Sequence, residues 1–347
     1  MTDQEYKDMI HGIVVPATLS DEETAKRYQL LVDFLQKETP KMLYRFRQCN
    51  ELSLDAFDQD KLFFSPPAEM NDSFDSMLYF SREQIDSALK RSAESETVQS
   101  LLASVRQGGE VPDTIRNAFS DSPEVLDVIS ERIAQMSPAD AQKHMELFQS
   151  FFGNQLDIYA SEIAQIVQKS IKAACFSENI NSAAMWGYYA DSGKGFALAY
   201  SFCDGNYISK DYCLARVIYD DERYDASEYA AWLLARKLFF NLGIISPSNN
   251  SPQYMLPCPD MFMHTKVLLH KAKAWSHEQE WRLTFSGNSA DDHPYILKRP
   301  SAIYLGRNVS AIHEKILRHI AVERGIPTYK MVIRKDNLTY NLFPEPI

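Results

Sequence analysis

The chain has 347 residues, of which 45% are hydrophobic, and it includes 19 Phe and 18 Tyr. This composition excludes a disordered chain and allows either one large domain or two of ordinary size. The formal net charge of −11 repels nucleic acid, so contact with a polyanion would need a local basic patch.

The cysteines and the apolar runs bear on the compartment. Five cysteines are scattered without a Cys-x-x-Cys pair, as is typical of reduced thiols in a cytosol. The opening Met-Thr-Asp-Gln-Glu lacks the basic and apolar regions of a signal peptide. No apolar run approaches the roughly 18 residues that cross a bilayer. We therefore expect a cytoplasmic protein that makes no membrane contact.

Residues 1–40 are expected to form a helical lead-in, with apolar residues at helical spacing after Asp21 and a stop at Pro40. The next segment, 41–81, carries two strand signals at 42–47 and 62–64, followed by an Asn-Asp-Ser-Phe-Asp loop at 71–75. These signals start a core that mixes strands and helices.

Residues 82–172 differ in composition, because they are rich in Ser, Gln, Glu and Ala. Apolar residues between Phe148 and Ile166 recur at steps of three and four, which predicts one helix face. Prolines divide the segment into several helices. We interpret it as a helical insertion between the two parts of the core, 41–81 and 173–347.

The second part of the core alternates strands and helices. Strands are predicted at 173–177, 196–202, 214–219, 280–285, 302–305 and 329–334, and helices at 227–242, 263–270 and 310–324. A polar loop is predicted at 246–252. The fold class is therefore α+β, a mixed core in two parts with a helical insertion between them. No Gly-rich phosphate loop is present, which argues against Rossmann and P-loop nucleotide sites.

The most informative motif runs from 275 to 283 and reads Trp-Ser-His-Glu-Gln-Glu-Trp-Arg-Leu. If it is a strand, Glu278 and Glu280 share one face, with Trp281 and Leu283 on the other. Paired carboxylates can divide their work, one stabilising a cation and the other moving a proton. The alternative is an exposed strand face that is merely acidic.

Other segments supply candidate ligand-binding residues. Arg45 and Arg47 share a face of the first strand, where arginine suits bidentate binding of phosphate; surface ion pairs are the alternative. Ser177 ends a strand, where it either contacts a ligand or caps the chain. Trp186 and Tyr189 either stack on a planar ring or pack into the core.

Histidines 264, 270 and 277 raise the question of a metal site. His264 and His270 are six residues apart, which does not place both on one helix face, and no paired cysteine accompanies them. We therefore expect no metal.

In chain order, these pieces resemble a bacterial family known as domain of unknown function number 2971. The matching residues are 43–46, 62–66, 71–75, 175–178, 185–190, Gly195 and 278–282. The Asn-Asp-x-Phe-Asp and Met-Trp-x-x-Tyr-Ala signals carry most of this resemblance. Ser73 stands where family members often have proline. The family itself implies no activity.

A more distant resemblance implies one. An aromatic-Arg strand, a strand ending in serine and a Glu-x-Glu strand, in that order, resemble the arginine-serine-glutamate class of ADP-ribosyltransferases. In that class a Ser-Thr-Ser motif is usual, and here Cys-Phe-Ser stands at 175–177, so that only Ser177 matches. The resemblance implies that Arg45 holds the phosphates or ribose of NAD. It also implies that Glu280 is the catalytic glutamate and that Glu278 assists the acceptor.

This resemblance implies a split mixed β-sheet core like that of ADP-ribosyltransferases, and NAD-dependent ADP-ribosyl transfer to a protein or nucleic-acid acceptor. Trp186 or Tyr189 would then cover the nicotinamide, and Asn71 and Asp72 would line the ribose or acceptor side, a turn role being their alternative. A bacterial toxin or phage-defence effector, with an antitoxin or defence-system partner, is the biological role we associate with this activity. The rival functions are a non-catalytic ligand- or partner-binding protein on the same scaffold, and a nucleic-acid-directed hydrolase.

Overall fold

The computed structural model describes residues 1–93, 131, 137, 161–165, 168–169, 171–202, 207, 212–241, 258–285 and 295–347. The predicted insertion therefore lies largely outside the described residues, as do the helix face at 148–166, except 161–165, and the loop at 246–252. Within 82–172 the structure describes α4 (Arg82–Ala93) and a short helical stretch at 161–165, and β3 already begins at Lys172.

The predicted lead-in consists of two helices, α1 (Asp3–Gly12) and α2 (Asp21–Glu38). Thr2 and Glu5 form a reciprocal capping box at the start of α1, and the Ser20 side chain caps α2. Both helices pack against the sheet through a cluster that joins Tyr6 and Leu35 to Ala215 of the strand β5 (Tyr212–Arg216). The lead-in is therefore part of the packed structure and not a detached segment.

In the part of the chain that the structure describes, eight strands form one mixed sheet in the order β12-β11-β10-β4-β1-β3-β8-β5. Their bounds are β1 (Leu43–Arg47), β3 (Lys172–Ser177), β4 (Phe196–Tyr200), β5 (Tyr212–Arg216), β8 (Glu280–Phe285), β10 (Ala302–Leu305), β11 (Thr328–Val332) and β12 (Phe343–Pro346). Neighbouring strands are antiparallel except β10 and β11. Two short ribbons accompany this sheet: β2 (Lys61–Phe63) with β9 (Tyr295–Leu297), and β6 (Ile218–Asp220) with β7 (His270–Ala272).

The sheet is weakly joined between β1 and β3. These strands pair at Tyr44 and Ser177 alone, whereas β1 pairs with β4 at five positions and β3 with β8 at six. Ser65, after β2, takes up pairing with β3 at Ala173 instead. The sheet is thus least firmly joined between β1 and β3, and residues of both strands line a cavity there.

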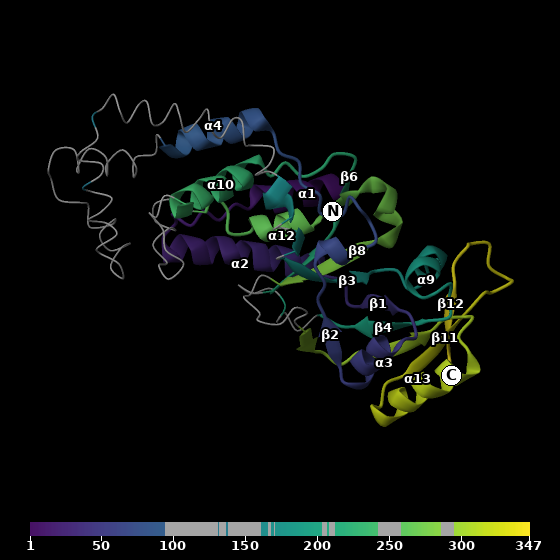
Figure 1. The fold of residues 1–347 in the computed structure, drawn as a ribbon. Helices are drawn as coiled ribbons and strands as arrows, with labels where there is room; N and C mark the ends of the chain where they lie inside the picture. Colours follow the sequence, from purple (N-terminus) through teal and green to yellow (C-terminus); the bar gives the residue numbers. More distant parts are fainter. Residues whose placement is uncertain are drawn as a thin grey trace.

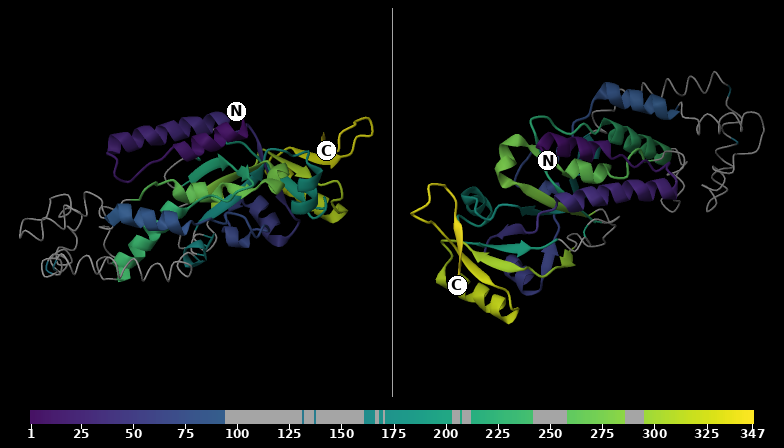
Figure 2. Two further views of the ribbon diagram at one scale, coloured as in Figure 1. Left: turned by 90° about the horizontal axis from the view of Figure 1, so that it is seen from above. Right: turned by 180° about the vertical axis from the view of Figure 1, so that it is seen from behind.

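The helices gather at the two ends of the sheet (Figure 1). Helices α1, α2, α10 (Ser227–Asn241) and α12 (Met263–Leu268) lie by β5 and β8, and α3 (Glu51–Asp58) and α13 (Ala311–Glu323) lie by β4, β10 and β11. The main hydrophobic core joins Leu43, Leu198 and Ile303 of the sheet to Leu317 of α13. The views from above and from behind show the same separation of these helices (Figure 2).

The structure confirms a mixed sheet accompanied by several helices. Strands β8 and β10 have the predicted bounds, and the predicted strand at 214–219 is two strands, β5 and β6. The described part of the chain contains no helix that is both long enough and apolar enough to cross a membrane.

Candidate functional site

A cavity of about 440 Å³ lies where β1 meets β3, within the size range of small-molecule sites. Residues from both strands line it, including Arg45 and Arg47 of β1 and Cys175 and Ser177 of β3. Tyr189, Asn71, Glu278 and Glu280 also line it. The structure thus brings together six of the eight site residues predicted from the sequence, although they come from distant segments. Asp72 and Trp186 are not among the lining residues.

Glu278 and Glu280 meet at the wall of the cavity, but not as neighbours on one strand. The 3-10 helix η2 (Lys273–Glu278) ends at Glu278, and β8 begins at Glu280. Gln279 between them adopts the left-handed conformation with φ 45°. The prediction of one continuous strand was therefore wrong, and a tight turn, not strand alternation, brings the two side chains together.

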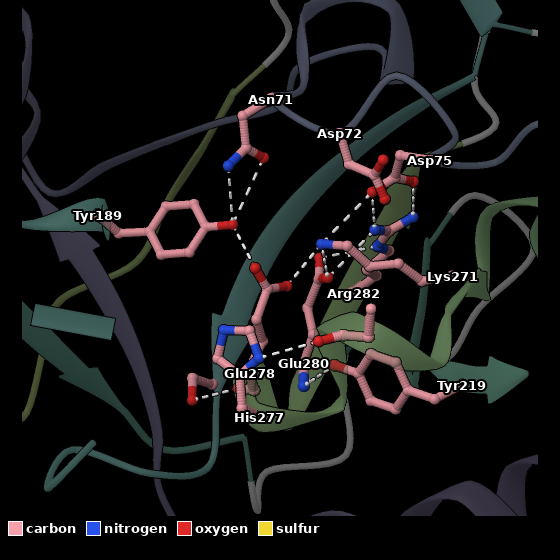
Figure 3. A network of polar contacts seen from close by, with 12 residues as sticks. Asn71, Asp72, Asp75, Tyr189, Tyr219, Lys271, His277, Glu278, Glu280 and Arg282 are labelled. Carbon is pink, nitrogen blue, oxygen red and sulfur yellow. Dashed lines mark hydrogen bonds and ion pairs between the residues drawn. The ribbon is translucent and has the colours of Figure 1, made fainter. Parts of the chain in front are cut away.

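Lys271 joins the two carboxylates. Its Nζ lies 2.5 Å from Glu278 Oε2 and 3.0 Å from Glu280 Oε2, with Asp75 Oδ2 at 3.6 Å. All four side chains are buried. Figure 3 shows the ammonium group of Lys271 between these acids. The alternative reading of a solvent-exposed acidic face is therefore incorrect for this pair.

Arg282 is the second cation of this network and is fully buried. It binds Asp75 in a bidentate manner, with Nη1 donating to Oδ1 at 2.7 Å and Nη2 to Oδ2 at 2.6 Å. Its Nε donates to Glu280 Oε1 at 2.8 Å, and Nη1 also donates to the Leu268 carbonyl oxygen at 2.6 Å. With three acids and two bases, the network carries one net negative charge when all its members are ionised.

The two glutamates have opposite pKa shifts. Burial alone would raise the pKa of Glu280, but the adjacent Arg282 and Lys271 outweigh it and hold that pKa well below its usual range. Burial raises the pKa of Glu278, and the negative charge of Glu280 adds to this against the opposing effect of Lys271. Glu280 therefore stays ionised at neutral pH, and Glu278 is the carboxylate more readily protonated.

Tyr189 reaches this network from α9 (Ala183–Tyr189). Its hydroxyl donates a hydrogen bond to Glu278 Oε1 and accepts one from Asn71 Nδ2 at 3.1 Å. Burial, followed by the contact with Glu278, raises the pKa of Tyr189. Asn71 and Tyr189 thus extend the carboxylate network along the cavity (Figure 3).

Trp186 and Asp72 do not contribute to the cavity wall. Trp186 is buried against Phe46 with its ring N–H donating to the Ile180 carbonyl oxygen at 2.7 Å, which is the core alternative left open by the sequence. Asp72 Oδ1 accepts from the Phe74 backbone N–H at 2.9 Å. This bond stabilises a turn, which is likewise the alternative stated for Asp72.

Arg45 lines the wall of the cavity formed by β1, and 7% of its surface is exposed. One guanidinium nitrogen, Nη2, donates to the Phe63 carbonyl oxygen at 2.8 Å. The other, Nη1, is buried and has no hydrogen-bond partner within the part of the chain that the structure describes. Burial, followed by the charge of Arg47, lowers the pKa of Arg45 to about 9. Arg45 is thus still a cation at pH 7, with an unused donor at the cavity.

Ser177 holds the end of η2 in place. Its hydroxyl donates to the Glu278 carbonyl oxygen at 2.6 Å and accepts from the Asn179 backbone N–H at 3.1 Å. Because these bonds use the hydroxyl donor, Ser177 fixes the backbone next to Glu278 although it also lines the cavity.

The three histidines considered for a metal site each contact a different group. His264 contacts the Tyr229 hydroxyl, His270 contacts His11, and His277 contacts the Ala274 carbonyl oxygen. Across the described residues, no group of three or more His, Cys, Asp or Glu side chains is arranged to hold a metal ion.

The sequence did not identify four members of the site: Lys271, Asp75, Arg282 and Tyr219, whose hydroxyl accepts a hydrogen bond from the Glu280 backbone N–H. Arg282 and Asp75 lie within the motifs described in the sequence. An arginine two residues after Glu280 could therefore have indicated a basic partner for that carboxylate. Lys271 and Tyr219 carry no local signal in the sequence. They come together only because β6 pairs with β7, which places them side by side.

Comparison with known proteins gives one partial match. Residues 185–283 match the family described as "Protein of unknown function (DUF2971)". This span contains Tyr189 of α9, Lys271, Glu278 and Glu280, and it supports the resemblance to that family drawn from the sequence. No curated protein and no solved structure matches the chain.

Proposed function

We propose that this protein transfers ADP-ribose from NAD to a macromolecular acceptor. The proposal rests on one observation above all: the cavity combines an arginine with an unused donor and a pair of buried carboxylates with opposite pKa shifts. Perturbed pairs of this kind are characteristic of acid-base sites.

Arg45 supports recognition of the NAD diphosphate. A buried guanidinium without a carboxylate partner is unfavourable by itself, and a phosphate oxygen would supply the missing acceptor and counter-charge. Arg47 lines the same cavity and would add a second positive charge. A small neutral ligand would supply no negative charge to balance these arginines and no charged acceptor for the unused donor of Arg45.

The glutamates support the chemistry at the other wall. Cleavage of the nicotinamide–ribose bond develops oxocarbenium character on the ribose, as glycoside cleavage does. Nicotinamide leaves with the bonding electron pair, and the acceptor nucleophile forms the new bond to the same carbon. Glu280, held ionised, stabilises the developing positive charge. Glu278 takes the proton that the acceptor loses.

One observation favours the non-catalytic alternative, a ligand-binding protein on this scaffold. Glu280 accepts hydrogen bonds from Arg282 Nε, Arg282 Nη2 and Lys271 and is also contacted by Cys175. Because a carboxylate has about four acceptor sites, little capacity remains for a ribose hydroxyl. In the catalytic proposal Glu280 therefore acts mainly through its fixed charge.

Two measurements test the proposal in order. NAD should raise the thermal unfolding midpoint of the purified protein in a concentration-dependent manner, because it binds the folded state only. Incubation with NAD labelled in the adenylate part, together with cell lysate, should then attach label to protein, RNA or DNA. The control is the Glu222→Gln variant, which alters an exposed surface glutamate. It should show both effects as the parent does. Absence of both effects would contradict the proposal.

The biological setting is proposed on the resemblance alone. An activity that modifies a macromolecule with ADP-ribose suits a bacterial toxin or a phage-defence effector, and such proteins need a partner that restrains them. Growth arrest on induced expression, relieved by Glu280→Gln, is the expected outcome. Equal arrest by both forms would contradict this setting.

A further inference from the structure

We propose that Lys271 is the positioning residue of this site, which holds Glu278 and Glu280 together at the cavity wall. Its role as a positioning residue for catalysis rests on the proposed function above, whereas its effect on the two carboxylates can be measured without NAD.

The ribbon of β6 and β7 supplies the geometry. Tyr219 of β6 is in register with Lys271 of β7, so the two side chains approach Glu280 from adjacent strands. The Tyr219 hydroxyl accepts a hydrogen bond from the Glu280 backbone N–H at 2.8 Å. The Lys271 ammonium donates to the Glu280 carboxylate at 3.0 Å. The ribbon of β6 and β7 thus holds both the backbone N–H and the side-chain carboxylate of Glu280.

The same ammonium also reaches the residue across the turn. Lys271 Nζ donates to Glu278 Oε2 at 2.5 Å, while the other oxygen of Glu278 accepts from Tyr189. Arg282, by contrast, contacts Glu280 and Asp75. Among the described residues, Lys271 is therefore the cation with hydrogen bonds to both candidate catalytic carboxylates.

Charge balance makes Lys271 necessary for this arrangement. Without it, Glu278, Glu280 and Asp75 would face the single positive charge of Arg282 in a buried site. Like charges close together cannot all stay ionised there. Replacing Lys271 should therefore force Glu278 to keep its proton to higher pH, and Glu278 would then no longer accept a proton near neutrality.

The first test measures the ionisation of Glu278 directly. Carbon-13 NMR of glutamate side-chain carboxyls follows each titration, and Glu278→Gln identifies the resonance by its loss. In Lys271→Met the midpoint of Glu278 should rise by about one to three pH units, the usual effect of an opposite charge at this distance. Lys273→Met is the control, because Lys273 lies on η2 but is 66% exposed and is paired with Asp221 at 3.6 Å. In this variant the titration midpoint of Glu278 should match that of the parent. An unchanged midpoint in Lys271→Met would overturn the proposal.

A double-mutant cycle covers the case in which Lys271→Met folds poorly. The thermal midpoint of Lys271→Met should be lowered, and adding Glu278→Gln should restore at least about half of the loss, because it removes one of the repelling charges. Additive losses would contradict the positioning role. Neither readout uses NAD, so a parent protein that fails to turn over NAD refutes the proposed function without deciding the effect of Lys271.

Discussion

Replacement of Arg282 by methionine should destabilise the protein more than replacement of any exposed lysine. Methionine retains much of the apolar volume but removes every hydrogen bond that the guanidinium makes. Asp75 loses both of its bonds to Arg282, and Glu280 keeps Lys271 as its remaining basic partner among those that the structure shows.

The magnitude follows from the burial of the acids that remain. Breaking a buried ion pair by removing one partner costs about 3–5 kcal/mol, because the other charge stays buried without compensation. With the usual entropy of unfolding per residue, this corresponds to a fall of about 4–7 °C in the unfolding midpoint of a chain of this length. Differential scanning calorimetry at pH 7 measures the change.

The pH dependence of this loss has a defined sign. Because the folded-state pKa of Glu280 is depressed, its ion pairs stabilise the fold above the pKa of the unfolded chain, and this stability is lost as pH falls through the folded-state value. Without Arg282 the carboxyl groups can protonate at higher pH. The difference between variant and parent should therefore shrink between pH 7 and about pH 5.

A surface ion pair provides the matched control. Lys26 and Glu22 are 2.7 Å apart with side chains 66% and 79% exposed, and such pairs contribute about 0–1 kcal/mol. Lys26→Met should therefore leave the midpoint within about 1 °C of the parent. An Arg282→Met midpoint equally close to the parent would refute the reasoning about the buried network.

Three further outcomes are expected. Arg45→Met should weaken NAD binding in calorimetry by about tenfold or more without lowering the thermal midpoint, since Arg45 is a buried cation that has no carboxylate partner among the described residues; a lower midpoint with unchanged affinity would argue against an anion role. Burial lowers the pKa of His270 to about 3, so stability should fall as pH drops from about 6.5 towards 3, and His270→Asn should flatten that slope in acid unfolding curves. Gly306→Ala should lower the midpoint because a Cβ there would lie 2.2 Å from the Gly193 carbonyl oxygen, whereas Gly12→Ala meets nothing within 4 Å and should not.

The strands that carry the site could be predicted from local patterns. Local strand signals marked β1, β3 and β8 closely, and Gly325 and Pro327, which follow α13, marked its end. The buried face of α13 was harder to infer, because apolar spacing alone did not distinguish Ile312, which is 72% exposed, from the fully buried Leu317. Long-range packing decides which apolar face is covered.

The polar site shows where sequence patterns stop being sufficient. The spacing of Glu278 and Glu280 correctly indicated that their side chains meet, but the left-handed turn at Gln279 could not be read from a Glu-x-Glu pattern. Lys271 lies seven residues before Glu278 in sequence, and strand pairing rather than local spacing brings it to the carboxylates. Buried charge networks depend on such pairings, which a single sequence does not specify.

The most direct test of the proposed activity is the rate of nicotinamide release from NAD by purified parent, Glu280→Gln and Glu278→Gln proteins. We predict that the parent cleaves NAD and that Glu280→Gln slows cleavage by at least about 10²-fold, while its affinity for NAD changes far less. Glu278→Gln should reduce transfer to an acceptor more than hydrolysis. Parental cleavage rates in Glu280→Gln would contradict the assignment of Glu280, and a parent protein that neither binds nor cleaves NAD, even with lysate present, would contradict the proposed function itself.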